Sequence, residues 1–395
     1  MVSCSKEENL SKKSIQDKEA AVEMITASAF LDKATINIQT KANANSWGNS
    51  NPNLVKDIAG ANASYCHPDV RYFPNGLQGY KFWMVFTPYF GIIGSSGNAS
   101  LYENPTVVVS NNAINWFNPL GLINPLQAPP LQADGELMAG GDRRGGYWSD
   151  TDWIYNNGQF ELYYRGNFIS QKSLQKIAAN SPNNTRKLNA PSADRNIVRQ
   201  VSSNGINWSA LEIAYTSNAP ATLYNNHVIS PSFIKVADAI IAYEVLFNTQ
   251  NEGYEGADKT FVLQRKSANG LDFTDFAASK IVHFDTKPWL SVNKNYTPWH
   301  LHACYSEGYY ILTLAVGNAQ NYSSEQIYLA FSKDGVNFRV YPKAIVSSDA
   351  YRSCIFPMGH TAEKIDFGAI IGLKSGYFKY RQFAVDKLLL SKFMN

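Results

Sequence analysis

The chain has 395 residues, of which 45% are hydrophobic and only 17% are charged, a composition that allows most of it to fold around an apolar core. Its 35 basic and 32 acidic residues leave a net charge of +3 without a long basic block, which argues against nucleic-acid binding. No run of 18 apolar residues occurs, so no transmembrane helix is expected. Aromatic residues make up 13%, which favours β-sheet and sugar-stacking surfaces over helical bundles.

The first residues resemble part of a targeting sequence. Cys4 follows Met-Val-Ser, which resembles the end of the lipobox where bacterial lipoprotein signal peptides are cut and the cysteine is acylated, although the charged and apolar regions of a signal peptide are missing. Ser5–Glu8 is similar to the export tag of surface lipoproteins in the Bacteroidota. The hypothesis is an exported protein, at the outer membrane or cell surface, with a lipid on Cys4. An ordinary disordered, charged N-terminus is the alternative.

Residues 9–33 place apolar side chains at helical spacing, which predicts one amphipathic helix. The tether and this helix define a first segment, residues 1–45, ahead of a main domain over residues 60–395. No Cys-x-x-Cys spacing for zinc occurs among the remaining cysteines, which are Cys66, Cys304 and Cys354. The last two could form a disulfide if their strands are neighbours, but buried free thiols are the interpretation we favour.

A turn sequence recurs along the main domain. Its four copies are Ser110–Trp116, Ser203–Trp208, Ser267–Phe273 and Ser332–Phe338. Each follows a short apolar strand, and the Asn-Gly and Asp-Gly pairs in three of them suit tight turns because glycine tolerates positive φ. Once a polar insertion over residues 170–195 is set aside, the copies recur about every 65 residues, a period typical of β-propeller blades.

Five strand starts run in step with these turns, at His67, Ser149, Ser230, Trp299 and Tyr351. Their number predicts an all-β fold, a five-bladed β-propeller with a short N-terminal helix. The C-terminal stretch Phe378–Leu390 is expected to supply outer strands that close the ring with the early chain. A pair of unrelated β-sandwiches would not explain two series that stay in phase.

The pattern resembles the five-bladed propeller superfamily of glycoside hydrolases that holds families 43, 32, 68, 117 and 130, over about residues 60–390 and without a single diagnostic motif. It is also similar to uncharacterised bacterial and phage proteins that share three motifs, which in this chain are His67–Val70, Tyr102–Pro105 and Ser149–Asp152. In the hydrolase families the first residues of the innermost strands surround a funnel at one end of the axis. The resemblance implies that carboxylates from different blades act there.

Hydrolysis of a glycosidic bond needs one carboxylic acid to protonate the leaving oxygen and one carboxylate to activate water or attack the sugar. By position, Asp69 resembles the general base, and Asp152 or Asp150 resembles the second-blade carboxylate that orients substrate. Glu103 begins the third strand of the first blade, which returns to the funnel, and is the candidate acid. For each of these carboxylates a structural role in a turn or strand entry is the alternative.

The third blade departs from the family pattern. Families 43 and 32 place their acidic glutamate near the start of this blade, where the present chain has Ile229, Ser230, Pro231 and Ser232. Glu103 could take over this role from the neighbouring blade, and Glu252 or Glu255 could reach in from the third blade's own loop. Otherwise the acid is absent, and the protein binds a glycan without cleaving it.

Other polar or aromatic residues fall on the predicted funnel face and are expected to bind substrate: His67, Arg144, Asp150, Arg165, Ser230, Trp299, His302 and Arg352. The arginines favour an anionic or heavily hydroxylated sugar, unless they pair with the acidic cluster. His300 and His302 form a His-x-His pair that could ligate metal, but no third ligand stands in register. We therefore predict no cofactor, and leave open a structural calcium ion on the axis.

Together these features predict a glycoside hydrolase that acts on a poly- or oligosaccharide at the funnel. The alternative is a non-catalytic carbohydrate-binding propeller, such as a surface glycan binder or a phage-type adhesin, and a protein-interaction propeller is a weaker third hypothesis. The expected partner is a carbohydrate, with no nucleic acid and with membrane contact only through the N-terminal anchor.

Overall fold

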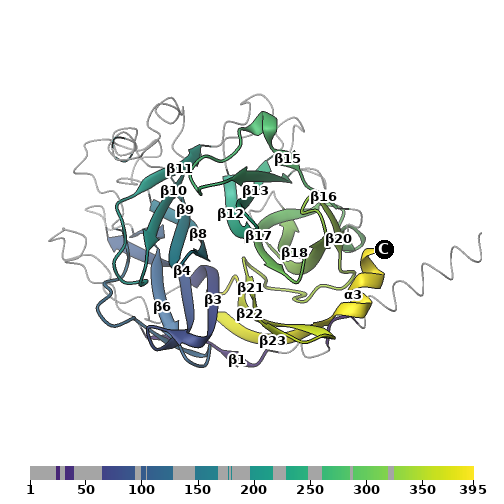
Figure 1. Ribbon diagram of the computed structural model, residues 1–395, viewed down its shortest axis with the longest axis horizontal. Helices are drawn as coiled ribbons and strands as arrows, with labels where there is room; N and C mark the ends of the chain where they lie inside the picture. Colours follow the sequence, from purple (N-terminus) through teal and green to yellow (C-terminus); the bar gives the residue numbers. More distant parts are fainter. Residues whose placement is uncertain are drawn as a thin grey trace, which may run out of the picture.

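The computed structural model describes residues 24–26, 32–39, 65–93, 99–103, 105–127, 147–167, 177, 179, 196–216, 228–247, 260–284, 288–318 and 324–395. Five antiparallel-based sheets are arranged around a central axis, which confirms the predicted five-bladed β-propeller. The innermost strands of the five blades lie nearest the axis in Figure 1. Among the described residues, no helix has the length and apolar character needed to cross a membrane.

The first three blades each begin with a strand at the axis and add further strands outward. From the axis, blade 1 contains β3 (Tyr65–Leu77), β4 (Tyr80–Ile93), β6 (Thr106–Ser110), β7 (Asn115–Phe117) and β2 (Asn37–Gln39), with β5 (Ala99–Glu103) paired to the far end of β4. Blade 2 contains β8 (Tyr147–Asn156), β9 (Gln159–Asn167), β10 (Asn196–Ser202) and β11 (Glu212–Thr216). Blade 3 contains β12 (Val228–Val236), β13 (Ala239–Phe247), β14 (Thr260–Ser267) and β15 (Lys280–Ile281).

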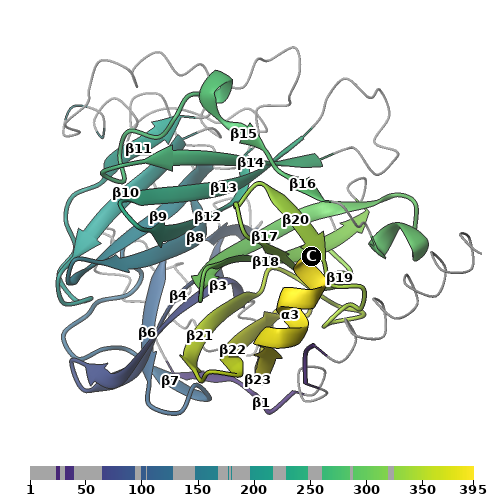
Figure 2. The same ribbon diagram turned by 45° about the vertical axis from the view of Figure 1, so that its right-hand side comes forward.

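The last two blades follow the same order. Blade 4 contains β17 (Tyr296–Ser306), β18 (Tyr309–Asn318), β19 (Gln326–Ser332), β20 (Asn337–Val340) and β16 (His283–Phe284). Blade 5 contains β21 (Cys354–His360), β22 (Lys364–Gly372), β23 (Phe378–Asp386) and β1 (Ala34–Thr35). A C-terminal helix, α3 (Lys387–Met394), follows β23 and packs beside blade 4, where Phe393 meets Phe331 (Figure 2).

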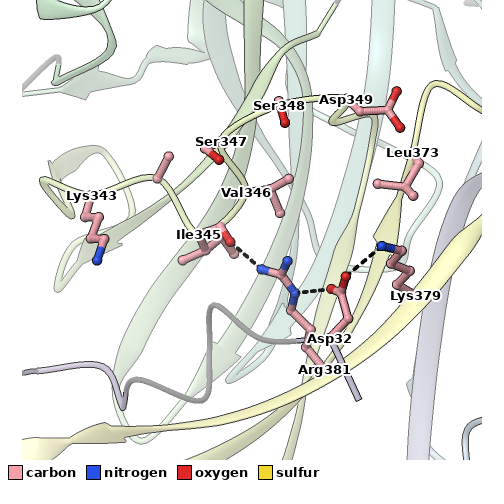
Figure 3. A pocket seen from close by; sticks show the side chains of 11 residues that line it. Asp32, Lys343, Ile345, Val346, Ser347, Ser348, Asp349, Leu373, Lys379 and Arg381 are labelled. Atoms are coloured by element: carbon pink, nitrogen blue, oxygen red, sulfur yellow. Dashed lines mark hydrogen bonds and ion pairs between the residues drawn. The ribbon is translucent and has the colours of Figure 1, made fainter. Parts of the chain in front are cut away.

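The ring is closed by an early segment of the chain, as predicted. β1 pairs antiparallel with β23 as the outermost strand of blade 5. Just ahead of it, the Asp32 carboxylate lies 2.8 Å from Lys379 Nζ and 2.6 Å from Arg381 Nε (Figure 3). These ion pairs border a cleft of about 400 Å³ between blades 4 and 5. The early and late parts of the chain are thus joined by both backbone and side-chain contacts.

A helix was predicted over residues 9–33, but the residues of this range that the structure describes are not helical. Met24–Thr26 form a bend in which Ile25 makes an antiparallel bridge to Val385, and Met24 and Ile25 are buried against blade 5. The rest of that range, like Cys4, lies outside the described residues. The three other cysteines are buried free thiols, as expected.

The recurring turn joins the third and fourth strands of a blade. In the second copy the capping serine is Ser202, one residue earlier than predicted: its Oγ accepts hydrogen bonds from the N–H groups of Asn204 and Gly205. The Asn204 side chain then accepts from the next two N–H groups. The same pattern recurs in the other copies, at Ser110, Ser267 and Ser332. Each turn is therefore fixed by local side-chain acceptors.

These turns also hold neighbouring blades together. A Cβ atom on Gly205 would lie 2.2 Å from the Trp83 ring of blade 1. In the next copy a Cβ on Gly270 would lie 2.4 Å from the Tyr163 hydroxyl of blade 2. Only glycine allows an aromatic ring of the preceding blade to approach so closely, and the positive φ of both residues favours glycine as well.

Candidate metal centre and active site

Polar side chains converge where the innermost strands begin. On β3, β8, β12 and β17, two polar residues stand two positions apart and form two levels across the axis. The first level consists of His67, Asp150, Ser230 and His300, and the second of Asp69, Asp152, Ser232 and His302. Arg352, just ahead of β21, contacts both levels. None of these nine side chains belongs to a residue more than 3% exposed.

The first-level residues occupy irregular points in their strands. The pairing register shifts between Cys66 and Asp69 on β3, and equivalent shifts occur on β8 and β12. On β17 the shift lies between Pro298 and His300, and His300 is itself paired with Ala315. His67, Asp150 and Ser230 have φ values of 53°, 54° and 48°, a left-handed conformation that costs a non-glycine residue about 1–2 kcal/mol. The same bulge is thus built into three blades, at the positions that bring polar groups together.

The second level joins adjacent blades. Asp69 Oδ2 accepts a hydrogen bond from the Trp153 N–H of blade 2 at 2.9 Å. One blade further, Asp152 Oδ1 accepts from the Phe233 N–H at 2.8 Å. In the following blade, Ser232 Oγ accepts from the Ala303 N–H at 2.8 Å. These three second-level side chains therefore bind the backbone just after their counterparts in the next blade, which is a structural role, whereas His302 binds the Asp69 side chain.

The second-level carboxylates are saturated by protein donors. Asp69 Oδ1 accepts from Arg71 Nη1 at 3.0 Å and from His302 Nε2 at 2.9 Å. Asp152 Oδ2 accepts from Ser232 Oγ at 2.6 Å and from Arg352 Nη2 at 3.2 Å. With the backbone donors, all four oxygens are occupied, and two arginines balance the two carboxylates. Although Asp69, Asp152 and His302 are close enough to surround a cation, this arrangement does not need one.

Burial and close packing of charge shift the second-level pKa values in opposite directions. Burial raises the pKa of Asp69, but Arg71 and His302 outweigh it, so that the pKa lies below its usual range. Burial and the neighbouring Asp69 carboxylate raise the pKa of Asp152. Burial lowers the pKa of His302 despite the nearby Asp69. His302 is therefore neutral near pH 7 and donates from Nε2 to Asp69.

The first level has a different organisation, because two imidazoles face one carboxylate. His67 Nε2 lies 3.2 Å from Asp150 Oδ1, and His300 Nδ1 lies 3.9 Å from the same oxygen. The two imidazole rings are 5.4 Å apart between centroids. Within the described part of the chain, neither His67 Nε2 nor His300 Nε2 has a hydrogen-bond partner. Buried nitrogens without partners are unfavourable and call for an explanation.

The other nitrogen of each imidazole is held by the protein. His67 Nδ1 lies 2.7 Å from Thr87 Oγ1 and 3.1 Å from Glu103 Oε2. His300 Nδ1 contacts the Ser230 hydroxyl. A hydrogen bond at Nδ1 fixes the ring and leaves Nε2 as the free nitrogen, which is how metal-ligating histidines are usually oriented.

The protonation states of the first level suit a cation. Burial raises the pKa of Asp150, but His67, Arg165, His300 and Arg352 outweigh it and hold the pKa well below its usual range. Burial lowers the pKa of His300 well below that of an ordinary histidine, although Asp150 acts in the opposite direction. Near pH 7 Asp150 is therefore ionised and His300 is neutral, which are the forms that bind metals.

The spacing of the ligand atoms also fits a divalent cation. His67, Asp150 and His300 each offer one ligand atom within 4.8 Å of the others. Around a tetrahedral Zn²⁺ with bonds of about 2.0–2.1 Å, neighbouring ligand atoms are roughly 3.3 Å apart. The 3.2 Å from His67 Nε2 to Asp150 Oδ1 matches this edge. Two histidines and one carboxylate, supported by Thr87, Glu103 and Ser230, thus form a consistent ligand set.

Glu103 and Arg165 complete the surroundings of this triad. Glu103 Oε2 accepts a 2.5 Å hydrogen bond from Ser149 Oγ in addition to its contact with His67. Burial raises the pKa of Glu103, but His67 and Ser149 outweigh this effect. The pKa therefore lies below its usual range, and the carboxylate is ionised. Arg165 Nε lies 2.8 Å from Asp150 Oδ2, which leaves Oδ1 of Asp150 facing the imidazoles.

The sequence-predicted site residues separate into several groups. His67, Asp150, Ser230, Arg165, Arg352 and Glu103 meet in or around the first level. Asp69 and Asp152 lie in the second level, where they join blades. Arg144, Glu252 and Glu255 lie outside the described residues. His300 joins the first level and not a His-x-His site, because His302 belongs to the second.

The expected contacts of His302 and Trp299 with a sugar need correction. His302 is fully buried, and its Nε2 is engaged by Asp69. Trp299 is 6% exposed and belongs to the hydrophobic core between blades 3 and 4. Tyr351 is instead the half-buried aromatic residue beside the first level, with ring centroids 4.6 Å from His300 and 5.7 Å from His67.

Comparison with known proteins places this site in context. The chain is 26% identical over 302 residues to the A type blood N-acetyl-α-D-galactosamine deacetylase of Flavonifractor plautii, an alignment that covers 73% of this chain and 36% of that protein. The chain therefore spans about a third of the length of this relative. No protein-family model matches the chain.

Solved structures share the fold. The crystal structure of an N-acetylgalactosamine deacetylase from F. plautii, in complex with blood group B trisaccharide, superposes with a TM-score of 0.62 at 17% identity, covering 92% of this chain and 98% of that one. A structure described as a glycoside hydrolase superposes with a TM-score of 0.53 at 11% identity, covering 93% and 94%. At these identities the likeness shows the propeller fold alone.

Proposed function

We propose that this protein is a metal-dependent carbohydrate deacetylase that hydrolyses the N-acetyl amide of an amino sugar in a glycan. The observation that carries the proposal is the cluster of His67, Asp150 and His300, whose ligand atoms lie within 4.8 Å of one another around an ionised carboxylate. One nitrogen of each imidazole, Nε2, has no hydrogen-bond partner among the described residues. The sequence likeness to a galactosamine deacetylase supports the substrate class. A lipid on Cys4, proposed from the N-terminal sequence alone, would hold the enzyme at the cell surface near external glycans.

The first level would hold a divalent cation through His67, Asp150 and His300. When bound, such an ion supplies Lewis-acid chemistry, by which water and an amide carbonyl both become more reactive. The protein residues prepare the site. Glu103 and Thr87 orient His67, Ser230 orients His300, and Arg165 keeps one oxygen of Asp150 turned toward the imidazoles. Tyr351 offers an apolar ring beside the triad, against which an acetyl methyl group or a sugar face can pack.

Glycosidic bond cleavage by a carboxylate pair is the competing prediction, and the site supports it less well. Its proposed base, Asp69, and its proposed partner, Asp152, have every oxygen engaged by a protein donor and are fully buried. Glu103, the proposed acid, has a lowered pKa, whereas a general acid needs a raised one. A glycan substrate remains common to both hypotheses.

The test is a parallel assay of two products. The purified protein is treated with a chelator, divided, and reloaded with Zn²⁺, Mn²⁺, Ca²⁺ or buffer. Each sample is incubated with oligosaccharides that end in N-acetylgalactosamine or N-acetylglucosamine, and acetate and new reducing ends are measured. We expect acetate release that requires added metal, and no new reducing ends. Reducing ends without acetate would favour the glycoside hydrolase, and glycan binding with neither product would favour the binding propeller.

Matched histidine variants make the assay specific to the site. His300→Ala is expected to lose bound metal and acetate release together, by at least about 100-fold. His360→Ala is the control, because the His360 side chain is 58% exposed at the far end of β21 and contacts Glu307. Equal metal content in His300→Ala and the wild type would contradict the assignment of the triad.

A further inference from the structure

Arg352 links the two levels and is held at one end only. The residue is fully buried, and its Nη2 donates to Asp152 Oδ2 at 3.2 Å and to the Pro231 carbonyl at 3.1 Å. These two acceptors come from blades 2 and 3, whereas Arg352 comes from the approach to blade 5. The guanidinium plane is therefore fixed by contacts on its second-level side.

The other side of the guanidinium faces the first level. Nη1 lies 3.6 Å from Asp150 Oδ1, the oxygen that is 3.2 Å from His67 Nε2. Within the described residues, no acceptor forms a hydrogen bond with Arg352 Nε or Nη1. Two buried donor nitrogens of a charged group are left without a hydrogen bond, which is unfavourable unless a ligand accepts from them.

A second buried arginine, Arg265, shows that buried arginines of this fold can bind protein acceptors through their Nε and Nη1 atoms. Arg265 Nε donates to Glu244 Oε1 at 2.8 Å, and its Nη1 donates to the Thr274 carbonyl at 2.7 Å. The two residues are about equally enclosed, at 1% and 0% exposure. The Arg265 side chain therefore binds neighbouring protein groups, whereas Arg352 has two donor nitrogens without an acceptor at the candidate metal centre.

We infer that Arg352 Nε and Nη1 bind the acyl oxygen of the substrate and the carboxylate of the acetate product. The inference rests on the proposed deacetylation and assigns to it a catalytic residue. In this reaction the water oxygen bonds to the carbonyl carbon, the C–N bond breaks, and both water protons end on the amine, which leaves as ammonium with acetate as the second product. Negative charge develops on the carbonyl oxygen, and a fixed guanidinium beside it stabilises that charge most in the transition state.

The geometry accounts for the choice of arginine. A guanidinium can bind Asp152 and Pro231 through one nitrogen while offering two further N–H groups in the same plane. A lysine ammonium could reach one of these positions but could not occupy both sides together.

The experiment compares Arg352→Lys with Arg265→Lys in the metal-loaded protein. Three quantities are measured: kcat and KM for deacetylation, the inhibition constant of acetate, and acetate binding by titration calorimetry, which needs no turnover. For Arg352→Lys we expect kcat to fall about 100–1000-fold and acetate affinity to fall at least about tenfold, with metal content unchanged. Arg265→Lys is expected to alter stability while acetate affinity stays as in the wild type.

The outcomes separate this inference from the proposed function. Acetate affinity in folded, metal-loaded Arg352→Lys within twofold of the wild type would overturn the role of Arg352 even if the wild type releases acetate. If the wild type binds metal and acetate but does not deacetylate, the proposed function fails, and the acetate titration still tests Arg352. Should Arg352→Lys not fold, acetate titration of the wild type decides, because an absence of binding overturns the inference.

Discussion

His67 Nε2 and Asp150 Oδ1 lie 3.2 Å apart although the two residues begin different blades. Both sit in a bulge with left-handed φ, at 53° and 54°. Backbone strain of this kind persists where the surrounding structure enforces it, and it is concentrated at functional sites. In this propeller the two strained residues place an imidazole and a carboxylate next to each other at the axis. The regular blades hold the inner strands in place, and the bulges in these strands bring the polar side chains of the site together.

The first prediction concerns Glu103, which positions His67 without contacting the proposed cation. Glu103→Gln keeps the size of the side chain but weakens the acceptor at His67 Nδ1. Loss of such a supporting group typically lowers metal affinity or activity about 10–100-fold. We expect a loss of this size, with activity restored at high metal concentration, measured by metal titration of the chelated protein.

Glu244→Gln is the matched control for this change. Glu244 is as deeply buried as Glu103 and is paired with Arg265 on blade 3. It is expected to lower stability and to leave metal affinity unchanged. Wild-type metal affinity in Glu103→Gln would show that Glu103 does not support His67 in this way.

The second prediction concerns alkaline pH. Burial raises the pKa of the Cys304 thiol from 9.0 to about 12, and burial also raises the pKa of Tyr164 well above its usual range. These groups stay neutral in the folded protein but ionise in the unfolded chain above about pH 9–10. Their stabilising contribution is therefore complete below about pH 9 and is lost as pH rises toward the folded-state pKa values.

We expect the free energy of unfolding to decrease from about pH 9 to 11, by up to about 1.4 kcal/mol per pH unit for each such group. Urea unfolding at several pH values measures this slope. Cys304→Ala should make this slope shallower. A slope that is the same in Cys304→Ala and the wild type would refute the assignment to Cys304.

Much of the fold could be predicted because it repeats. The turn at Ser202–Trp208 has counterparts in three other blades, and a repeated pattern supports an interpretation that no single copy would justify. The closing strand was also predictable, because the chain after the fifth strand start continues through Phe378–Leu390, which can supply outer strands that pair with the early chain. The position of Asp32 against Arg381 was not, since no periodic pattern marks a single ion pair across the ring.

The site was only partly predictable. Polar residues at the strand starts indicated that side chains from several blades would meet near the axis, and Glu103 lies beside His67 there. The His-x-His spacing of His300 and His302 was considered as a joint metal site and set aside, because no third ligand stood in register. The structure divides them between two levels, because the two alternate positions of β17 meet different partners from other blades. Such pairing depends on backbone geometry that the sequence does not display.

The third prediction tests the close contact of the recurring turn with the preceding blade. Gly158 and Gly205 both have positive φ, at 80° and 73°, so alanine at either should cost about 1–2 kcal/mol of backbone strain. A Cβ on Gly158 meets nothing within 4 Å, whereas one on Gly205 would lie 2.2 Å from the Trp83 ring. We expect Gly205→Ala to lower the free energy of unfolding by about 1–3 kcal/mol more than Gly158→Ala does, as measured by urea unfolding. Equal losses would mean that blade 1 adjusts without cost.

The last prediction uses Asp69, for which the two enzymatic hypotheses differ most. As a blade-joining residue, Asp69 accepts from Trp153 N–H, His302 and Arg71. Asp69→Asn would leave Arg71 without its charged partner in a largely buried site, which should lower the free energy of unfolding by about 3 kcal/mol. Acetate release per folded, metal-loaded molecule should stay within a few-fold of the wild type.

A general base of a glycoside hydrolase would behave in the opposite way. Asp69→Asn would then retain stability and lose hydrolysis by about 100–10,000-fold. Urea unfolding combined with the two-product assay distinguishes these results in one variant. Because Asp69 has no exposed surface and its oxygens are already occupied, the loss should appear in stability. If the variant is as stable as the wild type but loses glycosidic cleavage, Asp69 acts in catalysis, and the structural role assigned to the second level is wrong.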